Sequence, residues 1–262
     1  MSYKGGLTLT NIPIALQMFT LREESERDFA GTLRKVKELG FDGVEFAGFG
    51  GLPVHEVKVL IDEIGLQAVA CHIPLDELKN NLYQVIEDLK TLGCQYVVCP
   101  YLMPDSRSEE DYKALIPFLD HAGEICRNEG ITLCYHNHDF ELIKLSDGRM
   151  ALENIYDKTR PENVKAELDV YWLTKAGEKP VDWMERYQNR TPLIHLKDMT
   201  LDEEGFFAEL GTGGVDIEVI LDYGEKAGVQ WWIIEQDASR LTPFESIEIS
   251  INYLKQKLMK SI

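Results

Sequence analysis

Short apolar segments alternate along the chain with longer segments in which apolar residues recur at helical spacing. The short segments are about four to seven residues long and rich in Val, Ile, Tyr and Trp, which is typical of strands buried on both faces. Within Asp28–Leu39, apolar residues recur every three or four positions, and this spacing predicts an amphipathic helix. The same spacing predicts helices over Leu75–Leu92, Glu109–Asn128, Val215–Ala227 and Pro243–Met259.

A junction made of a helix, a glycine and an apolar segment occurs five times. The glycines are Gly40, Gly65, Gly93, Gly130 and Gly228. Glycine adopts the left-handed conformation found just past many helices without a steric penalty, so each junction predicts a helix end followed by a strand. Three further apolar segments, Pro13–Phe19, Val164–Val170 and Pro192–Lys197, bring the predicted strands to eight.

Eight strands that alternate with helices predict parallel pairing through right-handed crossovers. An open doubly wound sheet is one solution, and a closed (β/α)8 TIM barrel is the other. The barrel is favoured because the strand count reaches eight in 262 residues, which is about the usual barrel length. No G-x-G-x-x-G follows the first strand, which weakens a dinucleotide-binding interpretation. Because no Pro/Gly/Ser-rich linker interrupts the chain, we expect a single α/β domain over residues 1–262.

Composition narrows the classes of partner. The chain has 27 Lys and Arg against 45 Asp and Glu, a net charge of −18, which disfavours binding to nucleic acid or to anionic membranes. No stretch approaches the roughly 20 apolar residues of a membrane span, and the first 19 residues contain no apolar leader core. The five cysteines show no C-x-x-C spacing, and four of them lie in apolar, strand-like segments, namely Cys71, Cys94, Cys99 and Cys134. We expect these four to be buried thiols in a reduced, cytoplasmic protein.

Polar residues follow seven of the eight predicted strands. In a parallel barrel the strand ends meet at one rim, where the chemistry of such folds takes place. In chain order these residues are Gln17, Glu45, His72, His136, Asn137, His138, Asp139, Glu141, Asp169, His195, Lys197, Glu235 and Asp237. We expect them to lie around one cavity.

Side-chain alternation indicates which of these residues face inward. Thr132, Cys134, His136 and His138 share one face of the fifth strand, and Ile131, Leu133 and Tyr135 share the other. The apolar face suits packing against helices, so both histidines are expected to point into the barrel mouth. Glu235 follows four apolar residues, where a carboxylate is costly unless it is paired or bound to a cation.

Two or three imidazoles and two carboxylates around one cavity are ligands suited to a divalent Zn, Mn, Co or Fe ion. A structural alternative stays open, because strand-end histidines are often structural and a buried carboxylate could simply pair with Lys197. Asp198 and Asp237 are interpreted as supporting or loop-capping groups, and His55 and His121 as surface residues on helices. Backbone N–H groups of Gly211–Gly214 could cradle a phosphate, and a plain loop is the other interpretation.

Several longer motifs occur in order along the whole chain. The fifth strand reads YHNHDFE at Tyr135–Glu141. The others are LQMFTLR near the start, GFDGVEFAG at the second strand, AELDVYWL at 166–173, LIHLKDM at 193–199, LGTGGVDI at 210–217 and IIEQD at 233–237. With these motifs the chain resembles the xylose-isomerase-like barrel family of sugar and sugar-phosphate isomerases and epimerases.

The resemblance implies one divalent metal ion, commonly Mn, held by Asp169, His195 and Glu235. His136 is the best positional match for the fourth ligand, and His138 is the reserve. Characterised epimerases of the family carry a glutamate there that also transfers protons, so the histidine is a departure from the pattern. The resemblance further implies that a small-molecule sugar or sugar phosphate contacts Glu45, His72 and Lys197. Two other strand-end residues, Gln17 and Glu141, are also expected to contact the substrate. Family members often pair, so a homodimer is compatible with it.

The predicted function is a metal-dependent sugar or sugar-phosphate isomerase or epimerase that removes a proton next to a carbonyl through an enediolate. Glu235 would act on one face and His136 or His138 on the other, because an imidazole titrates near neutrality. Lys197 would steady the developing oxyanion.

Three alternatives accompany this prediction. A lyase or dehydratase acting on a keto-sugar, keto-glycoside or inositol derivative would use the same proton removal and then expel a neighbouring group. Cleavage of damaged DNA would need a basic groove, which the charge disfavours. A non-catalytic sugar-binding or metal-binding barrel is the third.

Overall fold

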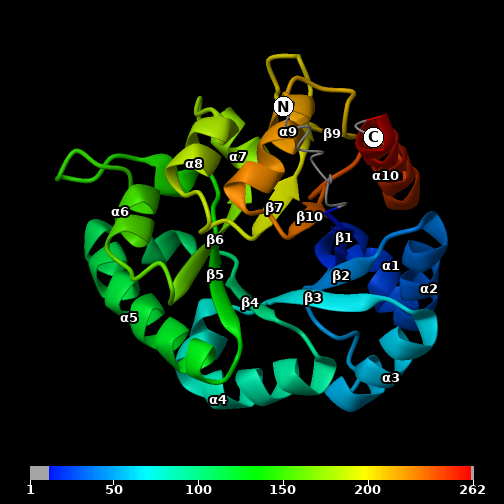
Figure 1. The fold of residues 1–262 in the computed structure, drawn as a ribbon, viewed down its shortest axis with the longest axis horizontal. Coiled ribbons are helices and arrows are strands. Elements are labelled where there is room, and N and C mark those ends of the chain that lie inside the picture. Colours follow the sequence, from blue (N-terminus) through cyan, green and yellow to red (C-terminus); the bar gives the residue numbers. More distant parts are fainter. Residues whose placement is uncertain (1–11, 261–262) are drawn as a thin grey trace, which may run out of the picture.

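Eight parallel strands close into a barrel in the computed structural model of the chain (Figure 1). The structure describes residues 12–260. The barrel strands are β1 (Ile14–Gln17), β2 (Gly43–Phe46), β3 (Gln67–His72), β4 (Tyr96–Cys99), β5 (Thr132–His136), β6 (Val164–Asp169), β7 (Leu193–Leu196) and β10 (Trp231–Ile234). Neighbours in sequence are neighbours in the barrel, and β10 pairs with β1 to close it. The predicted closed (β/α)8 barrel is confirmed.

Helices surround the barrel (Figure 1). They are α1 (Arg22–Arg27), α2 (Phe29–Leu39), α3 (Val54–Ile64), α4 (Leu75–Leu92), α5 (Glu109–Asn128), α6 (Ala151–Asp157), α7 (Val170–Lys175), α8 (Pro180–Arg186), α9 (Ile217–Ala227) and α10 (Pro243–Lys260). Three short 3-10 helices, η1 (Met18–Leu21), η2 (Pro104–Ser106) and η3 (Phe140–Leu142), and a hairpin of β8 (Asp198–Met199) and β9 (Phe207–Ala208) lie in loops.

Local side-chain contacts set the ends of several elements. α2 begins after Asp28, whose carboxylate accepts a hydrogen bond from the backbone N–H of Gly31 at 2.9 Å. α9 starts at Ile217, two residues later than predicted, because the Asp216 side chain caps it. β1 ends before the predicted Phe19, since the Gln17 side chain accepts a hydrogen bond from the Phe19 N–H at 3.0 Å and turns the chain into η1.

The core has two layers. A small inner cluster fills the barrel with Ala15, Val69, Ala70, Val98, Cys134, Leu193 and Ile233. A larger cluster packs the outer faces of the strands against the helices, and Leu133 and Tyr135 of β5 belong to it. The predicted alternation along β5 is therefore confirmed, because Cys134 faces the inner cluster while its neighbours face the helices.

The cysteines, two surface histidines and the helices were also the subject of predictions. All five cysteines are buried and unpaired, which confirms the prediction made for four of them and adds Cys126. His55 and His121 are exposed on α3 and α5, as predicted. Within residues 12–260, no helix combines the length and apolarity needed to cross a membrane. The stretch considered for a leader core begins in residues 1–11, which lie outside the described residues. One domain over residues 1–262 therefore stays a prediction.

Candidate active site

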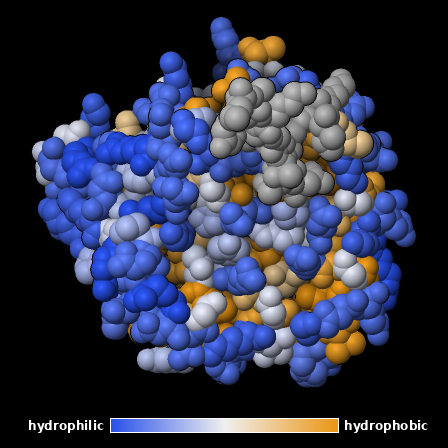
Figure 2. All heavy atoms as spheres, viewed as in Figure 1, coloured by the Kyte–Doolittle hydropathy of each residue, from blue (hydrophilic) through white to orange (hydrophobic). Residues whose placement is uncertain are grey.

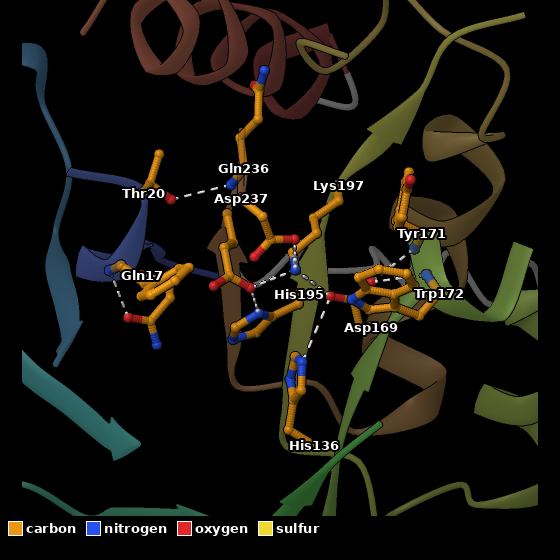
Figure 3. Close-up of polar contacts among 12 residues, drawn as sticks. Gln17, Thr20, His136, Asp169, Tyr171, Trp172, His195, Lys197, Gln236 and Asp237 are labelled. Atoms are coloured by element: carbon orange, nitrogen blue, oxygen red, sulfur yellow. Dashed lines mark hydrogen bonds and ion pairs between the residues drawn. The ribbon is translucent and has the colours of Figure 1, made fainter. Parts of the chain in front are cut away.

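Imidazole and carboxylate side chains meet at the carboxyl ends of the barrel strands. Figure 3 shows His136 of β5, Asp169 of β6, and His195 and Lys197 of β7 and its end converging, with Asp237 beside Lys197. The groups in this cluster that are almost fully buried are Glu45, His136, Glu167, Asp169, His195, Lys197 and Glu235. Buried ionisable groups are costly unless they are paired or bind a cation, so their contacts indicate what the cluster does.

His195 of β7 lies at the centre and uses both ring nitrogens. Its Nδ1 lies 2.8 Å from Oε2 of Glu235. Its Nε2 lies 2.6 Å from Oε2 of Glu45 and 3.1 Å from Oε1 of Glu167. The parallel register explains this meeting, because His195 is level with Asp169 of β6 and with Ile233, two residues before Glu235.

Glu167 contacts three histidines of the cluster, and it is not among the site residues predicted from the sequence. Its Oε1 lies 2.8 Å from Nε2 of His72 and 3.0 Å from Nδ1 of His136. Glu167 and Asp169 are two residues apart on β6, so both project into the barrel. Strand alternation was therefore a signal that could have identified it.

Lys197 lies among three carboxylates. Its ammonium is 3.0 Å from Asp169, 2.7 Å from Glu235 and 2.9 Å from Asp237. Although burial opposes the charge, these carboxylates raise the pKa of Lys197 well above its ordinary value. These contacts are the pairing that the structural alternative predicts. The cluster has five carboxyl groups in total, because Glu45 and Glu167 also belong to it. Lys197 provides a single lysine charge for these five groups.

Burial and neighbouring charges shift the pKa values of the cluster's other groups in opposite directions. Burial opposes protonation of His72, but Glu45 and Glu167 raise its pKa to about 10. Burial raises the pKa of Asp169 to about 6. Burial and the neighbouring His195 lower the pKa of His136 well below its ordinary value, which keeps its ring neutral. A neutral imidazole is the form that binds a metal ion.

Two overlapping sets of residues could hold a metal ion among the described residues. One contains His72, His136, Glu167 and His195, and the other contains His136, Asp169, His195 and Glu235. The second set consists of the ligands predicted from the sequence, with His136 as the fifth-strand member. Within each set the potential ligand atoms lie within 4.8 Å of one another.

The second set fits a metal ion better because each of its two histidines has one ring nitrogen that already contacts a carboxylate outside the set. Nε2 of His136 lies 3.8 Å from Asp169, whereas its Nδ1 contacts Glu167. His195 likewise directs Nδ1 to Glu235 and Nε2 to Glu45. Metal-binding histidines commonly give the second ring nitrogen to a carboxylate in this way. Oδ2 of Asp169 is also buried, and its contacts among the described residues are the Lys197 ammonium at 3.0 Å and Nε2 of His136 at 3.8 Å. A carboxylate oxygen has a second lone pair, so it can still accept a metal ion.

His138 lies outside both sets and is enclosed by aromatic rings. It stacks on Phe140 at 5.2 Å with an interplanar angle of 11°, and the rings of Tyr101 and Trp172 lie 5.1 and 5.2 Å away. Burial and the charge of Lys197 lower the pKa of His138 to about 3, so its ring is neutral. Its Nδ1 is buried and has no hydrogen-bond partner in residues 12–260.

A cavity of about 1020 Å³ borders the cluster. His72, His136, His138, Glu235 and Asp237 line one part of it, and aromatic residues line much of the rest. Buried polar atoms near the barrel mouth also lack hydrogen-bond partners within the described chain, namely Gln17 Nε2, Glu167 Oε2 and Trp172 Nε1. Native proteins rarely leave so many polar atoms unsatisfied, which indicates a site for a polar ligand.

Two further residues predicted to contact substrate lie in defined contacts. Gln17 is buried, and its carbonyl oxygen accepts the Phe19 hydrogen bond. Glu141 is buried below His138, where it accepts hydrogen bonds from the Tyr135 hydroxyl at 2.7 Å and the His138 N–H at 2.8 Å. Burial raises the pKa of Glu141 to about 7. Its contacts support the segment that carries His138, and a substrate contact by Glu141 or Gln17 stays a prediction.

The glycine-rich loop at Gly211–Gly214 surrounds an internal carboxylate. Oδ2 of Asp198 accepts hydrogen bonds from the N–H groups of Gly211 at 2.9 Å and Gly213 at 3.0 Å. Its Oδ1 accepts from Val215 at 2.9 Å. The backbone donors that could have cradled a phosphate are thus used by Asp198, which acts as the loop-capping group expected of it.

Comparison with known proteins agrees with the barrel and its strand-end cluster. A family model described as xylose isomerase-like TIM barrel matches residues 33–257. The chain belongs to this family. Residues 33–257 include seven of the eight barrel strands and every member of the two candidate ligand sets.

Several curated relatives are inosose dehydratases. An inosose dehydratase of Clostridium beijerinckii is 27% identical over 169 residues, which cover 57% of this chain and 56% of the relative. The chain spans about half the length of this and other curated relatives that it matches.

Solved structures share the fold. A sugar phosphate isomerase/epimerase of Parabacteroides distasonis superposes with a TM-score of 0.81 at 24% identity, covering 93% of this chain and 97% of the other. An IOLI protein with a bound zinc atom superposes with a TM-score of 0.75 at 16% identity, covering 95% and 99%.

Proposed function

We propose that the protein is a metal-dependent lyase or dehydratase that removes a proton next to the carbonyl of a keto-sugar, keto-glycoside or inositol ketone. The observation that carries this proposal is His138, a buried imidazole with an unpartnered nitrogen beside the predicted ligand set. The dehydratase relatives support the same class of reaction.

His136, Asp169, His195 and Glu235 would hold one divalent ion. When bound, a Mn, Zn, Co or Fe ion supplies a Lewis acid that polarises the substrate carbonyl. Glu45 contacts Nε2 of His195 and Glu167 contacts Nδ1 of His136, so these carboxylates would orient both histidines and leave the other ring nitrogen of each for the ion. The zinc in the IOLI neighbour supports the presence of an ion and leaves its identity open.

His138 would accept the proton from the carbon next to the carbonyl. The electron pair of that C–H bond forms a C=C bond, and the C–O bond one carbon further on breaks. The departing oxygen takes up a proton, which Asp237 can supply because its carboxyl group lines the cavity. The Lys197 ammonium lies 2.9 Å from Asp237 and can replace that proton. The products are an unsaturated ketone and either water or an alcohol, and no further reactant is needed.

The asymmetry of the proton-transfer groups favours elimination. Glu235 is contacted by both Lys197 and His195, which suits a metal ligand better than a free base. His138 instead has aromatic neighbours and a free nitrogen. A single base on one face is sufficient for elimination, whereas epimerisation requires a proton-transfer group on each face.

An isomerase or epimerase is the second candidate. Asp237 lines the cavity, and its side chain is 26% exposed, so it could return a proton to the opposite face. The name of the Parabacteroides neighbour supports this candidate. It would use the same ion and the same first proton removal.

Product analysis in heavy water separates the two candidates. The purified, metal-loaded protein is incubated with an inosose and with a methyl 3-keto-glucoside, and products are followed by mass spectrometry and NMR. Elimination predicts loss of water or methanol, whereas epimerisation predicts an isomer that carries one deuterium on carbon.

Two variants test the assigned residues. His138→Gln is expected to lower kcat by about 100-fold or more while metal content stays unchanged. Glu235→Gln is expected to lower both activity and metal content. His121→Gln, an exposed histidine of α5, is the matched control. Near-normal turnover by His138→Gln would contradict the proposal, and a chain that binds sugar and no metal would favour the non-catalytic alternative.

A further inference from the structure

The outer part of the cavity is lined by aromatic side chains from five separate segments. Phe19 lies in η1, Phe49 follows β2, Tyr101 follows β4, Phe140 begins η3 and Trp172 lies in α7. We call these five residues the aromatic wall. Binding of a ketone needs only the polar cluster, so it does not explain why the aromatic wall is present.

Arg107 holds part of the aromatic wall in place. Its guanidinium lies 3.5 Å from the ring centre of Phe140 and 4.8 Å from that of Tyr101. Its Nε donates a hydrogen bond to the carbonyl oxygen of Leu102 at 2.9 Å. Tyr101 and Phe140 also meet edge to face at 5.5 Å. These contacts fix both rings before any ligand arrives, which lowers the entropic cost of binding.

The aromatic wall is accessible to solvent and borders a large volume. Phe19 and Tyr101 are 41% and 42% exposed, which is unusual for large apolar residues beside a polar site. On the face seen in Figure 2, hydrophilic residues cover most of the periphery and apolar residues are exposed below the centre. The cavity volume of about 1020 Å³ matches the upper end of the usual range for drug-sized ligands, about 300–1,000 Å³. A free monosaccharide would leave much of it unfilled.

We propose that the aromatic wall is a subsite for a flat, apolar aglycone, so that the substrate is a glycoside of a keto-sugar with an aromatic substituent. This inference rests on the proposed function and names its substrate class. His138 connects the site of proton removal with the aromatic wall, because its ring contacts Tyr101, Phe140 and Trp172. In the elimination, the departing oxygen carries the aglycone, which therefore lies one carbon from the position where His138 acts.

The polar atoms on the aromatic wall suit such a ligand. Nη2 of Arg107 and Nε1 of Trp172 are buried donors that have no hydrogen-bond partner in the described chain. An oxygen atom at the edge of the aglycone, or the glycosidic oxygen itself, could accept a hydrogen bond from either. An aromatic ring stacked on the aromatic wall would gain affinity from ring contacts in addition to the area that it buries.

The experiment compares the binding of phenyl β-D-glucoside and methyl β-D-glucoside to the metal-loaded chain by calorimetry. Neither probe has a ketone, so neither can react, and the two differ only in the aglycone. The phenyl glucoside is expected to bind about tenfold more tightly. Equal affinities would overturn the inference.

Variants locate the preference on the molecule. Tyr101→Ala and Phe19→Ala are each expected to reduce the phenyl preference to about threefold or less while methyl glucoside affinity stays the same. Tyr83→Ala, which removes an exposed tyrosine of α4 away from the cavity, is the matched control. A preference that survives both cavity variants would contradict the subsite.

Other outcomes separate this inference from the proposed function. Selective phenyl binding without turnover of any keto-glycoside would overturn the function and keep the subsite. Turnover of inosose with no phenyl preference would keep the function and overturn the subsite. A change of oligomeric state on size-exclusion chromatography of Tyr101→Ala would show that a second copy covers the aromatic wall, which would also overturn the subsite.

Discussion

Glu167 shows how one buried carboxylate can organise several histidines. Its Oε1 lies within 3.1 Å of nitrogens from His72, His136 and His195. One oxygen therefore fixes the orientation of three rings, two of which belong to the candidate ligand set. A charged acceptor makes strong hydrogen bonds in such a buried site, so its removal should loosen all three.

Glu167→Gln is accordingly expected to weaken metal binding about 10-fold to 100-fold, because the amide has one acceptor oxygen and no charge to hold the rings. Competition with a chelator of known affinity measures the change. Glu110→Gln, whose side chain is 82% exposed on α5, provides the control. Unchanged affinity in Glu167→Gln would show that the rings are held by other contacts.

Segments between strands, rather than the strands themselves, give this barrel its individual features. The hairpin β8–β9 and the glycine-rich loop after it close around Asp198, which also accepts a hydrogen bond from the Met199 N–H at 2.8 Å. Gly213 lies so close to Asp198 that a β-carbon there would sit 2.4 Å from Oδ1. Glycine is thus required at this position because the backbone packs closely against the Asp198 carboxylate. The sequence of the loop alone is equally compatible with a phosphate site.

Asp198→Ala is expected to lower the free energy of unfolding by about 2–4 kcal/mol, because four backbone N–H groups, including that of buried Val215, would lose their acceptor. Chemical denaturation measures the loss. Glu203→Ala, an exposed substitution in the same connection, should change it by less than about 0.5 kcal/mol. Equal stability of the two variants would mean that water or a solute anion replaces the Asp198 carboxylate without cost.

The whole molecule concentrates negative charge at the barrel mouth. The chain carries a net charge of −18, and five of its carboxyl groups meet around Lys197, His72 and the other two histidines. Bringing buried carboxylates together costs free energy that a divalent cation would recover. Folding stability should therefore depend on the metal.

Adding Mn or Zn to the chelator-treated chain is expected to raise Tm by about 5–10 °C when the ion exceeds its Kd about 100-fold. Scanning calorimetry with and without the ion provides the measurement. Glu235→Gln should lose most of this shift, and His121→Gln should keep it. A Tm that does not respond to Mn, Zn, Co or Fe would argue that the ion pairs with Lys197 are the resting state of a structural cluster.

Periodicity and the rule of strand ends predicted much of this arrangement. Helices at Leu75–Leu92 and Glu109–Asn128 have the bounds expected from apolar spacing, because amphipathic periodicity extends through them. Asp169, His195 and Glu235 lie together because parallel strands bring their ends to one rim. Glu167 was missed although strand alternation indicates it, and the short helices α6, α7 and α8 have too few turns to give a periodic signal.

The sequence by itself determined the eight barrel strands, the longer helices between them and the rim that carries the polar residues, and it favoured a closed barrel over an open sheet, because these depend on local periodicity and chain connectivity. Only the tertiary structure decided which nitrogen of His136 and His195 meets which carboxylate, and that Asp198 fills the glycine-rich loop. It also decided that aromatic residues from five connections form one wall. Those features depend on contacts between segments far apart in the chain, and no local pattern encodes such contacts.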